Sequence, residues 1–205
     1  MAFKGWPVEA VEFYEGLEAD NTKRYWQEHA AVYERCVKGP MDELLAELAP
    51  EFGAGRVFRP YRDVRFSKDK SPYKLNCAAE LPGGYVSLSA DGLFAGSGLY
   101  MPGPEQLQRL RAAIDDPTSG SELQSIVDAL RAAGYEIGAH DVLKTAPKGY
   151  PKDHPRIELL RHKGIVMSKS WPVGAWLGTK KAKDRVVACL QAAGPLNAWL
   201  ERHVA

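Results

Sequence analysis

The sequence predicts an α+β domain in which one antiparallel sheet packs against helices from both ends of the chain. Apolar residues follow a helical spacing up to about residue 52, alternate from 56 to 100, and return to a helical spacing afterwards. Short turns containing glycine separate the alternating segments, and turns this short join antiparallel strands. Helices, then a meander, then helices are typical of the α+β class.

The N-terminal part predicts three helices, over residues 7–19, 21–38 and 40–49. Asp20 or Asn21 can cap the second helix, because both side chains accept a hydrogen bond from the first turn. Gly39 is expected to end that helix, and Pro40 to begin the third. Pro50 is expected to end the third helix.

The alternating part predicts four strands, over residues 57–66, 75–81, 85–90 and 93–100. The turns between the last three are Pro82-Gly83-Gly84 and Asp91-Gly92, and Asp-Gly is a strong hairpin signal. We therefore expect a sheet built mainly from residues 56–100.

The rest of the chain predicts helices at 104–114, 121–133, 157–161 and 180–202, the last broken near Gly194, and a strand at 165–171. Residues 140–160 contain three prolines and are expected to be mostly irregular. The chain is thus expected to be a single domain of residues 1–205. Its parts are a helical segment 1–52, a β meander 56–100, and a segment 104–205 with helices and a long basic loop.

Composition excludes several classes of protein. The 205 residues are 45% hydrophobic and 26% charged, which is ordinary for a globular protein. No apolar run approaches the roughly 18 residues of a membrane span, and the N-terminus lacks a signal-peptide core. The three cysteines, all on apolar faces, indicate neither disulfides nor a zinc ribbon. We expect a reduced, cytoplasmic protein with no membrane contact.

The net charge of +1 conceals four blocks of opposite sign. Residues 1–55 carry −6, residues 56–74 carry +5, residues 75–143 carry −6 and residues 144–205 carry +8. A near-neutral total argues against unspecific nucleic-acid binding over the whole surface. A local basic site is still expected, because the potential at a surface depends on where charges gather.

The segment 61–74, YRDVRFSKDKSPYK, is the most unusual in the chain. The candidate ligand-binding residues in it are Arg62, Arg65, Lys68, Lys70, Tyr73 and Lys74. An arginine fork matches phosphate or carboxylate, and serine hydroxyls near Ser71-Pro72 can complete an anion site. The competing interpretation is a solvated basic hairpin whose charges pair with the acidic blocks.

A second basic segment, 144–163, is interrupted by prolines. Lys148 and Tyr150 are further candidate ligand-binding residues, and His154 is a weak candidate for proton transfer. A loop of this length without regular structure is often functional, and the competing interpretation is a proline-pinned surface loop. The histidines lack the spacing of a metal site, and the glycines at 92–103 lack the third position of a dinucleotide fingerprint. We therefore expect no metal and no cofactor.

Four pieces of the sequence, taken together, resemble the uncharacterised family known as domain of unknown function 2461. They are NTKRYW at 21–26, RDVRFSKDKSPYK at 62–74, GLFAGSGLYMP at 92–102, and LKTAPKGYPKDHPRIELLRHK at 143–163. They follow the family's order and cover almost the whole chain, with Tyr25-Trp26 where many relatives have Trp-Phe. The resemblance implies a stand-alone cytosolic protein and carries no reaction, cofactor or catalytic residue.

Three functions stay open. The first is a binding module or an enzyme for a phosphorylated or otherwise anionic small molecule, with 148–156 closing over 62–74. The second is an interaction domain whose charges steer an acidic protein partner. The third, ranked last because no nucleic-acid-binding signature is recognisable, is contact with nucleic-acid phosphates. The sequence does not decide between enzyme and binder.

Overall fold

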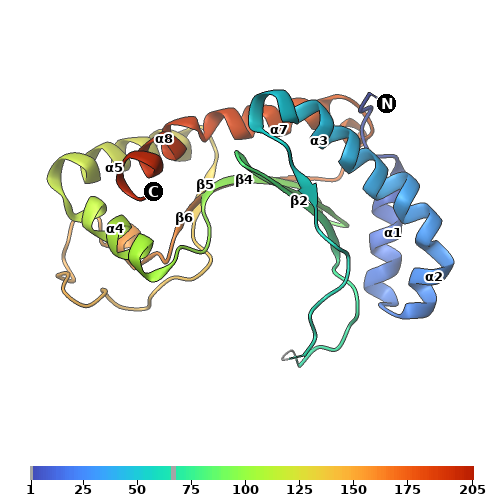
Figure 1. The fold of residues 1–205 in the computed structure, drawn as a ribbon, viewed down its shortest axis with the longest axis horizontal. Helices are drawn as coiled ribbons and strands as arrows, with labels where there is room; N and C mark the ends of the chain where they lie inside the picture. The colour runs from blue at the N-terminus through green and yellow to red at the C-terminus, as the bar shows by residue number, and fades with distance from the viewer. Residues whose placement is uncertain (1, 66–67) are drawn as a thin grey trace. The chain divides into compact units, whose positions relative to one another are not determined.

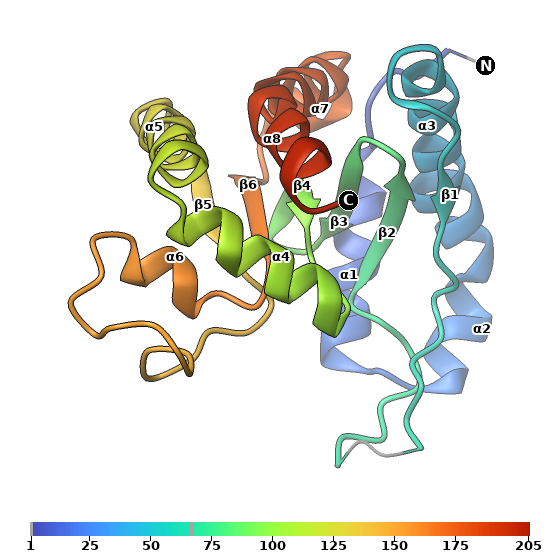
Figure 2. The same cartoon turned by 60° about the vertical axis from the view of Figure 1, so that its left-hand side comes forward.

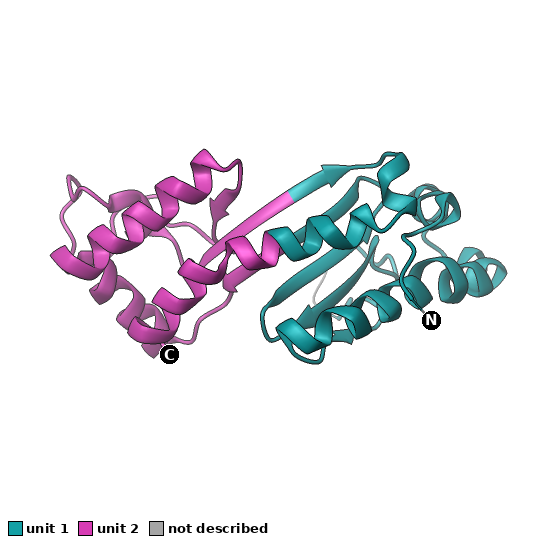
Figure 3. Cartoon of the chain, turned by 90° about the horizontal axis from the view of Figure 1, so that it is seen from above, with its two compact units in different colours: residues 1–95, 170–188 teal, residues 96–169, 189–205 magenta. Residues whose placement is uncertain are grey.

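A computed structural model describes residues 2–65 and 68–205 (Figure 1). The fold is α+β, as the sequence predicts, with one six-stranded sheet in the order β1-β2-β3-β4-β6-β5. Two compact units divide the chain (Figure 3). Unit 1 comprises residues 1–95 and 170–188, and unit 2 comprises 96–169 and 189–205. The expectation of a single domain stays a prediction.

Helices form most of the first 52 residues of unit 1. They are α1 (Val8–Ala19), α2 (Lys23–Val32), the π-helical segment η1 (Tyr33–Lys38) and α3 (Gly39–Phe52). Thr22 caps α2, since its hydroxyl accepts a hydrogen bond from the backbone N–H of Tyr25. A 3₁₀ turn, η2 (Ala175–Gly178), precedes α7 (Lys181–Ala192).

The predicted helix break at Gly39 is wrong. The helix continues through η1 into α3, and the Gly39 N–H donates to the carbonyl of Glu34, five residues earlier. Because Pro40 has no N–H to donate, a widened π turn just before it accommodates the proline without ending the helix. Pro50 likewise lies inside α3, which ends at Gly53 with a φ of +84°.

Strands β2 (Asn76–Leu81), β3 (Gly84–Ser89) and β4 (Gly92–Leu99) match the predicted meander. The first predicted strand is much shorter than expected, because β1 covers only Arg56–Val57. Beyond β1 the chain stays extended, with one isolated antiparallel bridge between Tyr61 and Tyr73. The predicted end of that strand, Phe66, lies outside the described residues.

The core of unit 1 lies between the sheet and its helices. Alternate side chains of a strand point to opposite faces. On the helix-facing side, Ala79, Val86 and Leu88 are completely buried, as are Leu44 of α3 and Val186 of α7. Figure 2 shows α1, α2 and α3 on one side of β1, β2 and β3.

The remaining elements belong wholly or mainly to unit 2: α4 (Pro104–Asp115), α5 (Pro117–Ala132), β5 (Glu136–Gly138), α6 (Ile157–Arg161), β6 (Ile165–Pro172) and α8 (Gly194–His203). Only β5 was not expected; it pairs antiparallel with β6. The Asp116 carboxylate caps α5, and Gly134 ends it with a φ of +78°. None of the described helices has the length and apolar character needed to cross a membrane.

Candidate anion-binding site

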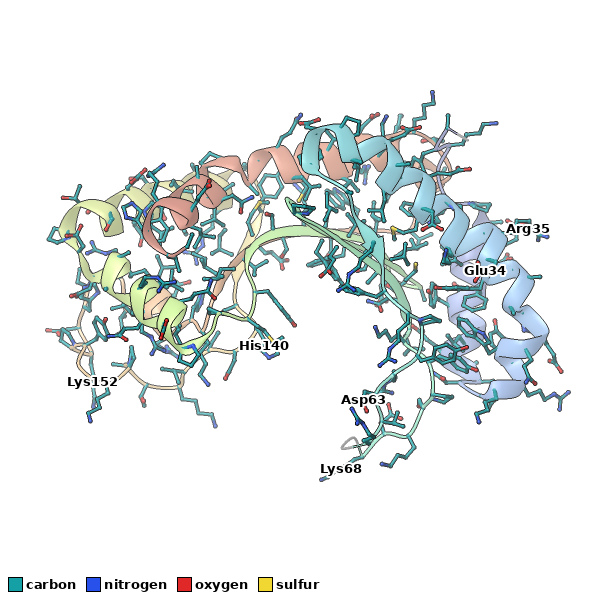
Figure 4. All side chains as sticks on the ribbon, in the orientation of Figure 1. Glu34, Arg35, Asp63, Lys68, His140 and Lys152 are labelled. Atoms are coloured by element: carbon teal, nitrogen blue, oxygen red, sulfur yellow. The ribbon has the colours of Figure 1, made fainter. Side chains whose placement is uncertain are left out.

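The basic segment of unit 1 forms an arm that extends the β1–β2 pair (Figure 2). We call residues 59–65 and 68–74 the basic arm. Its two sides are joined by backbone hydrogen bonds from Arg62 to Pro72 (2.9 Å) and from Lys74 to Pro60 (2.8 Å). Figure 4 shows Asp63 and Lys68 near the end of the arm that is farther from the sheet. The sequence therefore folds this segment as an exposed double-stranded arm.

Side chains from α2 and the turn before it hold the base of the arm. The amide of Asn21 donates to the carbonyl of Tyr73 (3.0 Å) and accepts from its N–H (3.1 Å). The Trp26 ring stacks on the Tyr73 ring, with centroids 4.3 Å apart and planes 8° apart. Tyr61, opposite Tyr73, lies 6.3 Å from the Trp26 ring centroid. These contacts fix the base of the arm to the helices of unit 1.

Both carboxylates of the arm are neutralised within the arm. The Arg65 guanidinium donates to both oxygens of Asp63 (3.0 and 2.7 Å), and Arg62 pairs with Asp69. Hydrogen bonds from Arg65 lower the pKa of Asp63, and those from Arg62 and Ser71 lower the pKa of Asp69. The guanidinium of Arg65, one of the candidate ligand-binding residues from the sequence, thus faces a carboxylate of the same chain.

Four cations of the arm form no salt bridge among the described residues: Arg59, Lys68, Lys70 and Lys74. Arg59 is still close enough to Asp63 to lower the pKa of that carboxylate. Lys70 donates to the carbonyl of Val64 (2.9 Å), and the Lys74 ammonium lies 5.4 Å from the Phe58 ring centroid. The acidic blocks elsewhere in the sequence therefore do not neutralise these four charges by direct pairing. Ser67 lies outside the described residues.

Tyr73 is a buried structural residue at the base of the arm. Its side chain is only 4% exposed, because it is stacked against Trp26 and tilted against Tyr61. Burial raises the pKa of its hydroxyl. We therefore leave Tyr73 out of the proposed ligand-binding set.

The second basic segment lies in unit 2 and is pinned to the end of α4. The Arg156 guanidinium donates to the carbonyls of Ile114 (2.6 Å), Asp115 (3.0 Å) and Asp116 (3.3 Å), which satisfies the last turn of that helix. Arg161 donates to the carbonyl of Leu143 (2.6 Å). Lys148 is exposed, Tyr150 is partly exposed, and burial raises the pKa of Tyr150.

His154 also pins this loop. Its Nδ1 accepts a hydrogen bond from the N–H of Arg156 (3.0 Å), so Nε2 carries the proton and faces an Asp115 carboxylate oxygen at 3.2 Å. The side chain is 9% exposed. Both ring nitrogens are engaged with the protein, an arrangement that orders a loop and leaves no free nitrogen for proton transfer.

His162 is a buried histidine with an unsatisfied nitrogen. It is 6% exposed, and its Nδ1 has no hydrogen-bond partner among the described residues. Burial lowers its pKa, and the nearby Arg131 and Arg161 act in the same direction, while Glu158 opposes them. The folded protein therefore favours the neutral ring.

We expect this histidine to make unit 2 less stable in acid. Because its pKa is lower in the folded state, the unfolded chain takes up the proton first, at about pH 6.5. Its contribution to stability is complete above that pH and falls as the pH drops towards the folded-state pKa. Urea unfolding at pH 7.5 and pH 5.5 should show a smaller pH effect for His162→Gln than for the wild type. Equal effects would contradict this role.

The structure brings together some of the predicted site residues. Arg62, Arg65, Lys68, Lys70 and Lys74 lie on one arm, whereas Lys148, Tyr150 and His154 lie in the other unit. That the two segments lie side by side stays a prediction. Sequence reasoning missed Arg59 as a member of the arm and Asn21 and Trp26 as its anchors. The motif NTKRYW contained the anchors, but nothing local linked it to the arm.

Comparison with known proteins gave one result. No curated protein and no solved structure showed a significant match. The family model described as conserved hypothetical protein (DUF2461) matches residues 9–199, which include the arm, its anchors and the second basic segment. The chain therefore belongs to this family of conserved hypothetical proteins, domain of unknown function 2461.

Proposed function

We propose that this protein binds an anionic ligand through the basic arm. The observation that carries the proposal is the set of three lysines without a salt bridge among the described residues, Lys68, Lys70 and Lys74, on an arm whose own carboxylates are already paired with Arg62 and Arg65. Like charges held close together repel one another unless an anion lies between them. Asn21 and Trp26 hold the base of the arm, so these cations stay on one short segment despite their electrostatic repulsion.

Binding is a better interpretation than catalysis. The one candidate for proton transfer, His154, uses both ring nitrogens to order its loop. The arm supplies lysine and arginine side chains, which hold phosphate or carboxylate groups by charge-assisted hydrogen bonds. Lys144, Lys148 and Lys152 of the second basic segment, in unit 2, are exposed as well, so the experiment below measures their contribution separately.

Calorimetric titration with a short inorganic polyphosphate tests this proposal and separates the two segments. The arm variant Lys68→Ala/Lys70→Ala is compared with Lys148→Ala/Lys152→Ala, which removes the same charge from unit 2. We expect the wild type to bind and the arm variant to bind about tenfold more weakly, because two exposed ionic contacts worth up to about 1 kcal/mol each are lost. Weakening by both variants would mean that unit 2 also binds the polyphosphate. No heat with the wild type, or no effect of the arm variant, would overturn the proposal.

A further inference from the structure

The sheet of unit 1 has a second face, opposite the helices in Figure 2. The register of β2 and β3 pairs Glu80 with Tyr85 and Ala78 with Ser87 on this face. Phe58 joins them, because its N–H donates to the carbonyl of Ala78 (2.8 Å) and continues the β1–β2 register. We call this surface the open face; Phe58, Glu80, Tyr85 and Phe94 are partly exposed on it, while the small residues Ala78 and Ser87 between them in the register are buried.

Aromatic rings run across the open face from strand to strand. The ring centroids of Phe58 and Tyr85 are 6.4 Å apart, and those of Tyr85 and Phe94 are 5.9 Å apart at an angle of 75°. All three residues are partly exposed, whereas Ala79, Val86 and Leu88 on the helix-facing side are completely buried. A planar ligand that stacks on one ring can therefore meet the edge of the next.

Cations connect this aromatic row to the basic arm. Arg56 and Lys74 lie over the ring of Phe58, with the guanidinium carbon 5.6 Å and the ammonium 5.4 Å from its centroid. Arg56 is paired with Glu80, but Lys74 has no acidic partner among the described residues. Since residue 58 leads directly into the arm, aromatic surface and unpaired positive charge are continuous within unit 1.

We propose that the open face and the basic arm together bind single-stranded nucleic acid. Bases stack on Tyr85 and its aromatic neighbours, and the phosphates contact Arg59, Lys68, Lys70 and Lys74. The inference rests on the proposed anion binding and names its ligand class. It accounts for two features at once, since simple anion binding needs the cations but gives no reason for partly exposed rings beside them.

The chemistry favours single strands over the other polyanions. Stacking on side-chain rings needs bases whose faces are free, and a duplex hides those faces. Aromatic side chains on a sheet face that stack two or three bases, with nearby lysine and arginine contacting the backbone, are a general mode of single-strand binding. An acidic peptide would use the cations and leave the row of rings without a specific role.

Fluorescence anisotropy with a labelled 20-nucleotide oligothymidine tests the inference. An unlabelled duplex of equal length and poly-L-glutamate serve as competitors. The variant Tyr85→Leu removes the ring, and the matched variant Tyr85→Phe keeps it. We expect Tyr85→Leu to bind the oligonucleotide about tenfold more weakly, because base–aromatic stacking is lost, and Tyr85→Phe to bind like the wild type. We expect duplex and poly-L-glutamate to compete more weakly than unlabelled oligothymidine. Thermal unfolding confirms folding, and Phe94→Leu replaces Tyr85→Leu if that variant does not fold.

The possible results separate this inference from the one on which it rests. Equal binding of single strand and duplex, unchanged by Tyr85→Leu, would leave anion binding standing and overturn the role of the rings. Stronger competition by poly-L-glutamate than by oligothymidine would overturn it in favour of an acidic protein partner. Absence of binding to every polyanion would overturn both proposals.

Discussion

Replacing Trp26 with alanine should destabilise unit 1 by about 3 kcal/mol and loosen the basic arm. The ring contacts four other rings: Phe13, Tyr33, Tyr61 and Tyr73. Two of these belong to the helical part and two to the base of the arm. The expected loss is at the lower end for a large aromatic residue, because Trp26 is partly exposed. Urea unfolding measures it.

Limited trypsin digestion measures the arm separately. Cleavage after the arm's lysines and arginines should be faster in Trp26→Ala than in the wild type, because the local opening of the arm becomes easier. Trp176→Ala is the matched control, since Trp176 is also partly exposed and lies in unit 1 against Arg185. Unchanged cleavage in Trp26→Ala, or equally faster cleavage in both variants, would mean that the Trp26 stack does not anchor the arm.

Reversing two charges on the arm should have the largest effect on binding. The variant Lys68→Glu/Lys70→Glu changes the net charge of residues 56–74 from +5 to +1, because each substitution removes two units. At low salt we expect polyphosphate affinity to fall by roughly 100-fold, as two charge-assisted contacts are lost and repulsion is added.

The matched control is Lys180→Glu/Lys181→Glu, which makes the same change in net charge at exposed positions at the start of α7. Its affinity should stay within about threefold of the wild type, because exposed charges distant from the ligand act weakly through salt solution. If both variants lose affinity equally, the affinity for polyphosphate depends on the total charge of the protein, and the arm is not a specific binding site.

Much of the fold followed from local patterns in the sequence. The meander was predictable because Tyr85-Val86-Ser87-Leu88-Ser89 alternates and glycine turns flank it. The predicted helix break at Gly39 was wrong because local sequence rules do not show that a π turn lets the helix continue through Pro40. Strand β5 was missed because three residues are too few for a period, and only pairing with β6 makes them a strand.

The candidate site was predictable in its residue types and less so in its geometry. The cations of 62–74 were evident from composition, but their partners depend on contacts that the sequence pattern does not show. Asn21 and Tyr73 are 52 residues apart, and no local pattern connects them. The position of Tyr85 in the aromatic row could have been predicted from the sequence. The alternation that places Val86 and Leu88 in the core also places Tyr85 on the other face of the sheet.

Backbone NMR during titration with inorganic polyphosphate tests the central claim most directly. Amide signals of the described arm residues, 59–65 and 68–74, should shift progressively and saturate, with the largest changes around Lys68 and Lys70. Signals of α1 and α7 should stay in place. Saturable shifts confined to residues outside the arm, or no saturable shifts at all, would contradict the claim that the basic arm is the anion-binding site.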